Sequence, residues 1–348
     1  MRIAVDVMGG DHGPGVIIAG IKLALRSSGA AGIEQLWLVG DQLQIKTEME
    51  RCALRDDRLQ VLHASEVLTM EDKPVEGLRR KRDCSINRAI ELVKDGKAEA
   101  MISPGNTGGV VAAATLKLRP LAGVDRPGIA AVMPAPDNDF LLLDAGANVE
   151  CRPRHLLHYA IMGSIFAREI LGYKTPRVGL LSVGTEDNKG NELTLEAFKL
   201  CKSVAINFIG NVEGHDLFSN RVDVVVCDGF VGNVVLKTCE SLASNLMLWL
   251  KRELKKTPNR ALGAFLARGA FRNLKRRTDP DTYGGAPLLG LNGSVTISHG
   301  SAGEQAIANA IRLTAEAVRH QINQHIMVEV ARANERLAPM GPSLSEVT

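Results

Sequence analysis

Aromatic residues and long apolar runs are scarce in this sequence. Phe, Trp and Tyr make up 4% of the 348 residues, whereas glycine occurs 34 times. This balance suits the strands and turns of an α/β protein better than a β-sandwich. No stretch of about eighteen residues is apolar throughout, which argues against a membrane span. Residues 1–13 lack the apolar stretch of a secretory signal. We therefore expect a cytoplasmic protein whose membrane contact, if any, is peripheral.

The sequence also lacks the usual motifs of cofactor and metal sites. No G-x-G-x-x-G opens a helix after a strand, and no G-x-x-x-x-G-K-[ST] is present, so a nucleotide site is unsupported. The six cysteines have no C-x-x-C spacing, and several fall in apolar runs, which predicts reduced core residues. His155 and His158 lack an intervening Glu and a third ligand, which favours structural roles. We expect neither a cofactor nor a metal.

A hydrolase triad is not visible either. "SHGSAG", residues 298–303, is close to a nucleophile elbow, but His299 stands where that motif needs glycine. Ser301 and Glu304 also fit a capping box for the C-terminal helix, and we favour that interpretation.

Short apolar runs alternate with helical patterns along the chain, which predicts an α/β fold with a mostly parallel sheet and helices on both faces. The predicted strands are residues 2–7, 35–40, 59–64, 98–103, 128–134, 140–146, 177–184, 206–212, 222–229 and 293–298.

Short glycine-rich loops with Asn or Asp follow many of these strands. They are residues 8–15, 103–109, 144–148, 184–191 and 228–233. Loops at the carboxyl ends of strands line the ligand crevice of an open α/β sheet, so we expect them to converge. The alternative is that glycine and asparagine serve there as turn and cap residues.

The loop at 184–191, "GTEDNKGN", carries Lys189 between a predicted strand and a predicted helix. Backbone N–H groups at such a helix start favour an anion, and the lysine adds a full positive charge. Glu186 and Asp187 lie beside it, so this loop alone does not identify a phosphate site.

The absence of a general base is compatible with a nucleophile that carries its own charge. Inorganic phosphate, whose second pKa is near or somewhat above the ~6 of a phosphoester, is largely anionic at neutral pH. A thiolate, with a pKa of ~8.5, is a tolerable leaving group. An enzyme joining the two would need to position them and stabilise an oxyanion with lysine, amide and backbone N–H groups.

Six motifs in order carry a resemblance to a known family: "DVMGGDHGP", "GNTGG", "LLDAGAN", "GTEDNKGNEL", "CDGFVGNVVLK" and "YGGAPLLGLNG…SHGSA". Over residues 1 to about 330 the chain resembles the phosphate acyltransferases of bacterial phospholipid synthesis. That family is similar in fold to phosphotransacetylases and to isocitrate and isopropylmalate dehydrogenases, which implies two lobes around a cleft. Pro104 and Gly109 replace alanines of the "SAGNTGA" pattern, a change that leaves Asn106 in place.

The resemblance implies an acyltransferase that forms acyl phosphate from long-chain acyl-(acyl carrier protein) and inorganic phosphate, works without a cofactor and forms a homodimer. Lys189 and Asn233 would be the catalytic pair. Asp187 would orient the lysine or be a surface turn residue. The other residues implied to bind substrate or phosphate are Gly10, Asp11, Gly105, Asn106, Thr107, Gly108, Asn148, Gly184, Thr185 and Gly232.

Two other functions stay open at this point. One is a short-chain phosphotransacetylase that uses coenzyme A. The other is a non-catalytic membrane-binding module built on the basic segment described next.

Positive charge is concentrated between Trp249 and Arg277, where ten Lys and Arg accompany the single acid Glu253. The net charge of this segment is +9, whereas the formal net charge of the whole chain is +3. The remaining residues therefore carry a net charge of −6. An apolar stripe interrupted near Pro258 predicts two amphipathic helices that form a protruding hairpin. The hairpin residues expected to meet a partner are Lys251, Arg252, Lys255, Lys256, Arg260, Leu262, Phe265, Leu266, Arg268, Arg272, Lys275, Arg276 and Arg277.

A basic amphipathic hairpin can bind an anionic membrane, an acidic protein such as a carrier protein, or a second subunit. The simplest alternative is a solvated hairpin that packs on the body. Nucleic acid is not expected, because few aromatic residues are available for stacking and no recognised motif is present.

For the domains, we expect one lobe from residues 1–150 with 285–335, and a second lobe from 151–284 that includes the arm at 245–277. Residues 336–348 carry Pro, Ser and Gly without periodicity and are expected to be a frayed tail.

Overall fold

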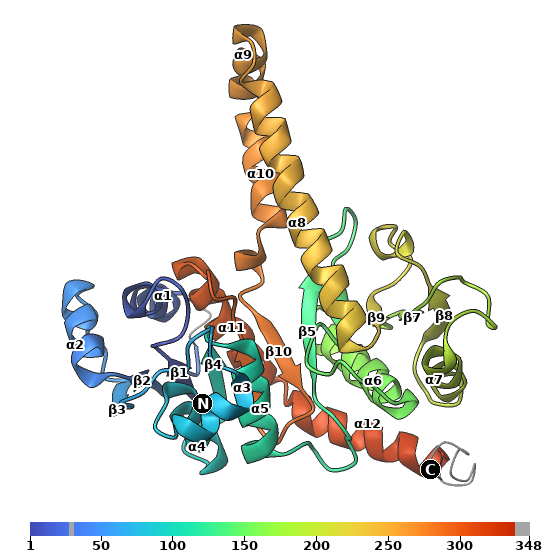
Figure 1. Cartoon of the computed structure of the whole chain (residues 1–348), viewed down its shortest axis with the longest axis horizontal. Helices are drawn as coiled ribbons and strands as arrows, with labels where there is room; N and C mark the ends of the chain where they lie inside the picture. The colour runs from blue at the N-terminus through green and yellow to red at the C-terminus, as the bar shows by residue number, and fades with distance from the viewer. Residues whose placement is uncertain (28–30, 338–348) are drawn as a thin grey trace.

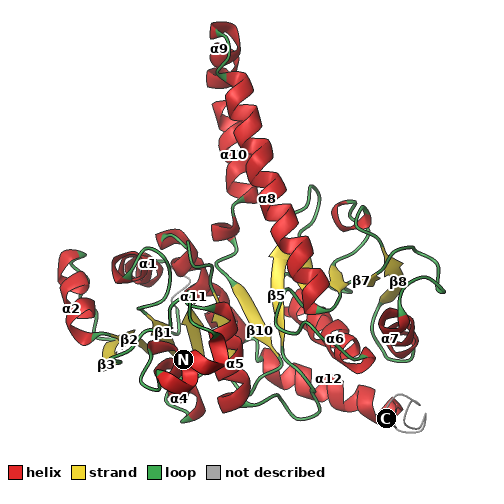
Figure 2. Cartoon of the chain, in the orientation of Figure 1, coloured by secondary structure: helices red, strands yellow, loops and turns green. Residues whose placement is uncertain are grey.

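One continuous sheet of eleven strands runs through the chain (Figures 1 and 2). The structure is a computed structural model that describes residues 1–27 and 31–337. The strand order is β3-β2-β1-β4-β11-β10-β5-β6-β9-β7-β8. The strands are β1 (Arg2–Asp6), β2 (Gln35–Gly40), β3 (Leu59–His63), β4 (Ala100–Ser103), β5 (Gly128–Met133), β6 (Phe140–Leu143), β7 (Val178–Leu181), β8 (Phe208–Val212), β9 (Val224–Val226), β10 (Ala286–Leu289) and β11 (Ser294–Ile297).

The predicted mostly parallel sheet is confirmed, but its centre is antiparallel. Each predicted strand is present, with ends that differ by a few residues. The sequence prediction missed β10, which pairs antiparallel with both β11 and β5, and β5 pairs antiparallel with β6. Three successive reversals make the parallel set β1, β4 and β11 run opposite to the parallel set β6, β9 and β7.

β10 escaped prediction because its sequence reads as a turn. Two glycines precede it, and Pro287, which pairs with Thr296 of β11, cannot donate a backbone hydrogen bond. A proline normally argues against a central strand. Here the pairing partners override local propensity.

Helices cover both faces of the sheet, as expected. They are α1 (Pro14–Arg26), α2 (Gln42–Arg51), α3 (Pro74–Arg80), α4 (Ser85–Lys94), α5 (Thr107–Leu118), α6 (Pro153–Glu169), α7 (Glu192–Lys202), α8 (Gly229–Leu254), α9 (Pro258–Leu266), α10 (Arg268–Thr278), α11 (Glu304–Arg319) and α12 (Ile322–Leu337), with 3₁₀ turns η2 (Asp216–Phe218) and η3 (Pro280–Thr282).

Strand alternation explains the two layers. In β1, Ile3 and Val5 pack in the cluster that contains α1 and α11, whereas Ala4 packs in the cluster that contains α4 and α5. In β6, Leu141 and Leu143 pack against α6. Because successive side chains of a strand point to opposite faces, each half of the sheet has a core on both sides.

The two histidines of α6 have structural partners. His155 Nδ1 accepts a hydrogen bond from the backbone N–H of Arg152, and His158 Nδ1 accepts one from Asp125 N–H. Burial lowers the pKa of His158 to about 4, so the ring is neutral at neutral pH. The structural interpretation of this pair is therefore confirmed. Three of the six cysteines, Cys84, Cys201 and Cys227, are buried as predicted for core residues, whereas the other three are only partly buried.

The basic segment forms helices that project away from the sheet (Figure 1). α8 has 26 residues, about 39 Å of helix, and α9 begins at Pro258, where an interruption was predicted. The predicted second helix is divided in two at Ala267, so the segment has three helices. Among the described helices, none has both the length and the apolar composition that a bilayer crossing requires.

The predicted tail is helical at its start, because α12 extends through Leu337. Residues 338–348 lie outside the described part of the chain. The division into two lobes with boundaries near 150 and 285 stays a prediction, since the described strands of both proposed lobes belong to one sheet.

Candidate active site

Three loops meet at the carboxyl ends of β1, β4 and β11. The backbone N–H of Asp11 donates to Gly300 O at 2.7 Å. Gly9 lies so close to the β4 loop that a Cβ on it would come within 2.6 Å of Gly105 N. Gly10 lies against Gly300 in the same way. This group therefore contains Gly10, Asp11 and Gly105 from the predicted site.

A buried carboxylate, Asp6 at the end of β1, organises these loops. Ser103 Oγ donates to Asp6 Oδ2 at 2.7 Å, and Gly105 N–H donates to Ser103 Oγ at 3.0 Å. Burial raises the pKa of Asp6 above its ordinary value. Sequence reasoning missed Asp6, because its partner Ser103 is 97 residues away.

Asn106 is the N-cap of α5. Its Oδ1 accepts from Gly109 N–H at 2.9 Å, and its Nδ2 donates to the carbonyls of Thr69 and Asp72. The side chain is buried, whereas Thr107 and Gly108, at the start of the helix, are exposed. The capping interpretation describes what Asn106 does in the structure.

A second group of loops follows the adjacent parallel strands β6, β9 and β7, whose ends align to within one residue. Its centre is Asp144, which is fully buried. The carboxylate accepts backbone hydrogen bonds from Ile129, Gly146, Ala147 and Asn148, and one from the Asn148 side chain. Burial raises the pKa of Asp144, although these donors oppose the shift.

The side chain of Asn148 faces the protein interior. Its Nδ2 lies 2.6 Å from Pro127 O and 2.9 Å from Tyr159 Oη, in addition to Asp144. The side-chain amide of Asn148 therefore stabilises the loop through these inward contacts.

α8 begins in this second group with Asp228 as N-cap. The Asp228 side chain accepts from Val231 N–H, and Gly229 N–H donates to Asn148 O, so the first donors of the helix already have partners. Asn233 is exposed one turn further on. Gly146 packs on it: a Cβ there would come within 3.4 Å of Asn233 Cβ. Gly232 is buried against the β6 loop.

Lys189 lies in the loop after β7 with an exposed side chain. Its ammonium has no ion pair or hydrogen bond with any other residue in the described ranges. Asp187 pairs instead with Lys202 of α7, at 2.7 Å. Gly184 is buried beneath the lysine, where a Cβ would come within 2.9 Å of Lys189 Cγ. Thr185 is exposed in the same loop.

The five loops therefore do not form one group, as expected, but two. The antiparallel strands at the centre of the sheet reverse the direction of the second set of parallel strands. α8 links the groups. It starts at the β9 loop, and Lys237, two turns along, lies 3.5 Å from His299 Nε2 in the β11 loop. His299 and Lys237 were not in the predicted site, since 62 residues separate them.

The capping box predicted for Ser301 and Glu304 is wrong. α11 begins at Glu304 with Gly303 as N-cap and no side-chain cap bond. Ser301 Oγ lies instead 2.8 Å from His299 Nδ1.

The hairpin exposes both its charge and its apolar residues. Leu262, Phe265 and Leu266 are 61%, 60% and 77% exposed. Arg268 stacks on the Phe265 ring at 4.6 Å. Arg277, by contrast, donates to the carbonyls of Ala135 and Pro136 at the base of the hairpin. That arginine anchors the hairpin to the body.

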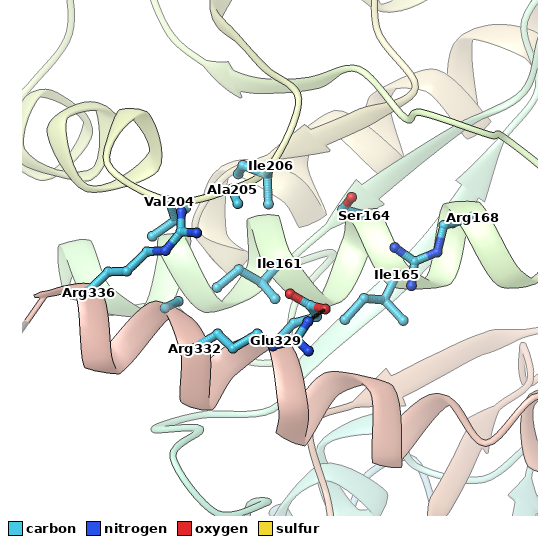
Figure 3. A pocket seen from close by; sticks show the side chains of 11 residues that line it. Ile161, Ser164, Ile165, Arg168, Val204, Ala205, Ile206, Glu329, Arg332 and Arg336 are labelled. Atoms are coloured by element: carbon cyan, nitrogen blue, oxygen red, sulfur yellow. Dashed lines mark hydrogen bonds and ion pairs between the residues drawn. The ribbon is translucent and has the colours of Figure 1, made fainter.

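A cavity of about 250 Å³ lies away from the predicted site, between α6, α12 and the segment before β8 (Figure 3). Its walls are mixed: Ile161 and Ile165 of α6 are apolar, whereas Arg332 and Arg336 of α12 add charge. None of the predicted site residues lines it.

Comparisons with known proteins agree with the motifs. The family model described as "Fatty acid synthesis protein" matches residues 1–325. A phosphate acyltransferase of Nitratidesulfovibrio vulgaris is 46% identical over 345 residues, with 99% of each chain covered. One of Geotalea daltonii is 45% identical, with 96% of this chain and 95% of that protein covered.

Solved structures show the fold. A phosphotransacetylase from Streptococcus pyogenes matches with a TM-score of 0.63 and 16% identity, covering 92% of this chain and 94% of that one. A branched-chain phosphotransacylase from Enterococcus faecalis V583 matches with a TM-score of 0.57 and 16% identity, covering 91% and 99%. With motifs, family model and full-length relatives in agreement, the chain belongs to the phosphate acyltransferase family.

Proposed function

We propose that this protein transfers a long-chain acyl group from acyl carrier protein to inorganic phosphate, forming acyl phosphate for phospholipid synthesis. Lys189 and Asn233 are its catalytic pair in this proposal. The ammonium of Lys189 neutralises phosphate as it approaches the thioester, and Asn233 donates a hydrogen bond to phosphate or to the thioester oxygen. Of the other predicted site residues, Asn148, Gly184 and Gly232 shape the group of loops that carries these two.

The observation that carries the proposal is the uncompensated ammonium of Lys189. Its acidic neighbour Asp187 pairs with Lys202, which leaves the lysine charge available to a ligand. The N–H groups at the starts of α5, α7 and α8 are partly occupied by their own caps. A side-chain cation therefore becomes the main attraction for a phosphate in this part of the molecule.

The activity is tested by thiol release. Purified protein with phosphate and a long-chain acyl-(acyl carrier protein) should release free carrier thiol and form acyl phosphate, and the rate should vanish without phosphate. Acetyl-coenzyme A offered in competition distinguishes the alternative of a short-chain phosphotransacetylase. Turnover of acetyl-coenzyme A in preference to the carrier-bound acyl group would replace the proposal by that alternative. No thiol release from any donor would favour a non-catalytic membrane module.

The basic hairpin completes the proposal as a partner surface. Its exposed apolar residues and its charge suit an anionic surface, either the membrane that receives the product or the acidic carrier protein. A homodimer would bury apolar area that a single chain exposes. Peripheral association with the membrane and a homodimeric state are thus parts of the same proposal.

Charge neutralisation in the hairpin should weaken binding to anionic vesicles. Replacing Lys255 and Lys256 together by Gln is expected to reduce affinity for phosphatidylglycerol vesicles about thirtyfold, because each lysine near such a surface contributes about 1 kcal/mol. Sedimentation with the vesicles measures this, with Lys46→Gln/Lys94→Gln as the charge-matched control. Affinity should fall steeply with salt. Binding that ignores both salt and substitution would assign the contact to the apolar residues Leu262, Phe265 and Leu266.

A further inference from the structure

His299, in the loop that follows β11, contacts its own loop on one side of the ring and α8 on the other. Its Nδ1 lies 2.8 Å from Ser301 Oγ and accepts the backbone N–H of Ser301 at 3.3 Å. Its Nε2 lies 3.5 Å from Lys237 Nζ of α8. The ring is exposed on the surface where the β11 loop meets α8.

One of these contacts distinguishes the two nitrogens. The Ser301 backbone N–H donates to Nδ1, so Nδ1 is the acceptor nitrogen in this arrangement and Nε2 carries the proton. The Lys237 ammonium can only donate as well. With Nε2 protonated, these two donors lie 3.5 Å apart and do not satisfy one another, so an acceptor oxygen placed beside both would bind both.

A third donor lies next to them on α8. Asn233 and Lys237 are four residues apart, so their side chains lie on one face of the helix. No hydrogen bond to the Asn233 side chain is formed within the described ranges. Ser298, directly before His299, has a buried hydroxyl that is also without a partner among the described residues. Unused polar groups thus gather where α8 passes the end of β11.

The geometry points to His299 and Lys237 as the donors that stabilise the oxyanion formed on the carbonyl oxygen of the acyl thioester. This inference rests on the proposed function and deepens it. A phosphate oxygen forms a bond to the carbonyl carbon, and the π electron pair moves to the carbonyl oxygen. The pair then returns, the C–S bond breaks, and sulfur leaves with its electrons as thiolate. His299 keeps its proton throughout and acts only as a hydrogen-bond donor.

The local charge favours this oxyanion over inorganic phosphate as the ligand. Glu240 pairs with Lys237 at 2.8 Å, and the Asp11 carboxylate lies beside Gly300, on the same loop as His299. These acids oppose the entry of a dianion. A neutral carbonyl can enter, and its oxygen acquires charge only during reaction, when the donors become useful. Lys189, which lacks an acidic partner in the described structure, is left for phosphate.

Paired substitutions at His299 test the inference. Asn keeps an acceptor near the Nδ1 position for Ser301 but offers no donor near Nε2, whereas Gln can offer N–H there. His299→Asn should lower kcat for acyl phosphate formation at least about tenfold with unchanged KM values for phosphate and acyl-carrier protein. His299→Gln should retain most of the rate, and Lys237→Met should lower kcat in the same way.

The controls are His320→Asn at the C-cap of α11 and Lys46→Met on α2, which remove the same groups at exposed positions and should leave kcat unchanged. Thermal melting of each variant checks that it is folded. A higher KM for phosphate with unchanged kcat would overturn the inference and make the pair a phosphate clamp. Equal loss in the Asn and Gln variants would overturn it too, since a structural role would then explain both. Failure of the wild-type protein to release thiol would refute the proposed function itself.

Discussion

Replacing Lys189 by Met should lower the rate of acyl phosphate formation by about 10²–10³-fold, the cost of removing one positioned donor to developing negative charge. The folded state should be unaffected, because the ammonium forms no hydrogen bond or ion pair with other residues that the structure describes. The melting temperature is therefore expected to stay that of the wild type. Thiol release under saturating phosphate, together with a phosphate titration, measures the change.

The matched control is Lys199→Met, an exposed lysine on the helix that follows the same loop. It removes the same charge from the same region and should leave the rate unchanged. A full rate in the Lys189 variant would remove the lysine from the catalytic pair. A loss of rate accompanied by a lower melting temperature would reassign it to the structure of the loop.

Asp144→Ala should destabilise the protein severely, by about 3–5 kcal/mol, a large part of the stability of an ordinary domain. The carboxylate is fully buried and accepts hydrogen bonds from four backbone N–H groups and one side chain. Removing it leaves these donors with no acceptor in the interior, and each such loss costs about 1–3 kcal/mol. Urea unfolding followed by circular dichroism measures the change.

Asp144→Asn should fall between Ala and the wild type, because one acceptor oxygen remains while an amide N–H₂ faces the donors of Asn148. The control is Asp57→Ala, an exposed aspartate, where a change within about 0.5 kcal/mol is expected. Similar urea midpoints for all three variants would show that Asp144 does not stabilise the loop. Activity of the Asn variant adds a second readout, since the loop packs on Asn233 through Gly146.

Local sequence was sufficient for much of the fold. Alternating apolar runs and helical patterns predicted every strand of the sheet except β10. Runs of Val, Ile and Leu of strand length indicate a buried strand whatever its neighbours in the sheet are. Pro258 marked the turn of the basic segment in advance, since a proline begins a helix far more readily than it continues one. β10 was missed because its Pro287 is tolerated only through its neighbours in the sheet.

The candidate site could be predicted less completely from the sequence. Lys189 and Asn233 each lie within one local motif that carries the family resemblance, in the β7 loop and in the first turns of α8, so the sequence alone could suggest them. Asp6, Asp144 and the contact between Lys237 and His299 depend on residues that meet across the fold, and no spacing in the sequence signals them. Asn106 and Asn148, which the motifs suggested as ligands for phosphate, hold their loops with inward hydrogen bonds.

By itself, the sequence determined the α/β class, the glycine-rich loops, the concentration of charge in one segment and the family, because each is written in local composition and order. Tertiary structure decided which loops meet. Three antiparallel pairings at the centre of the sheet reverse the second set of strands, and one long helix then carries Lys237 from one set of loops to the other. Strand direction depends on long-range pairing, and long-range pairing is a property of the whole chain.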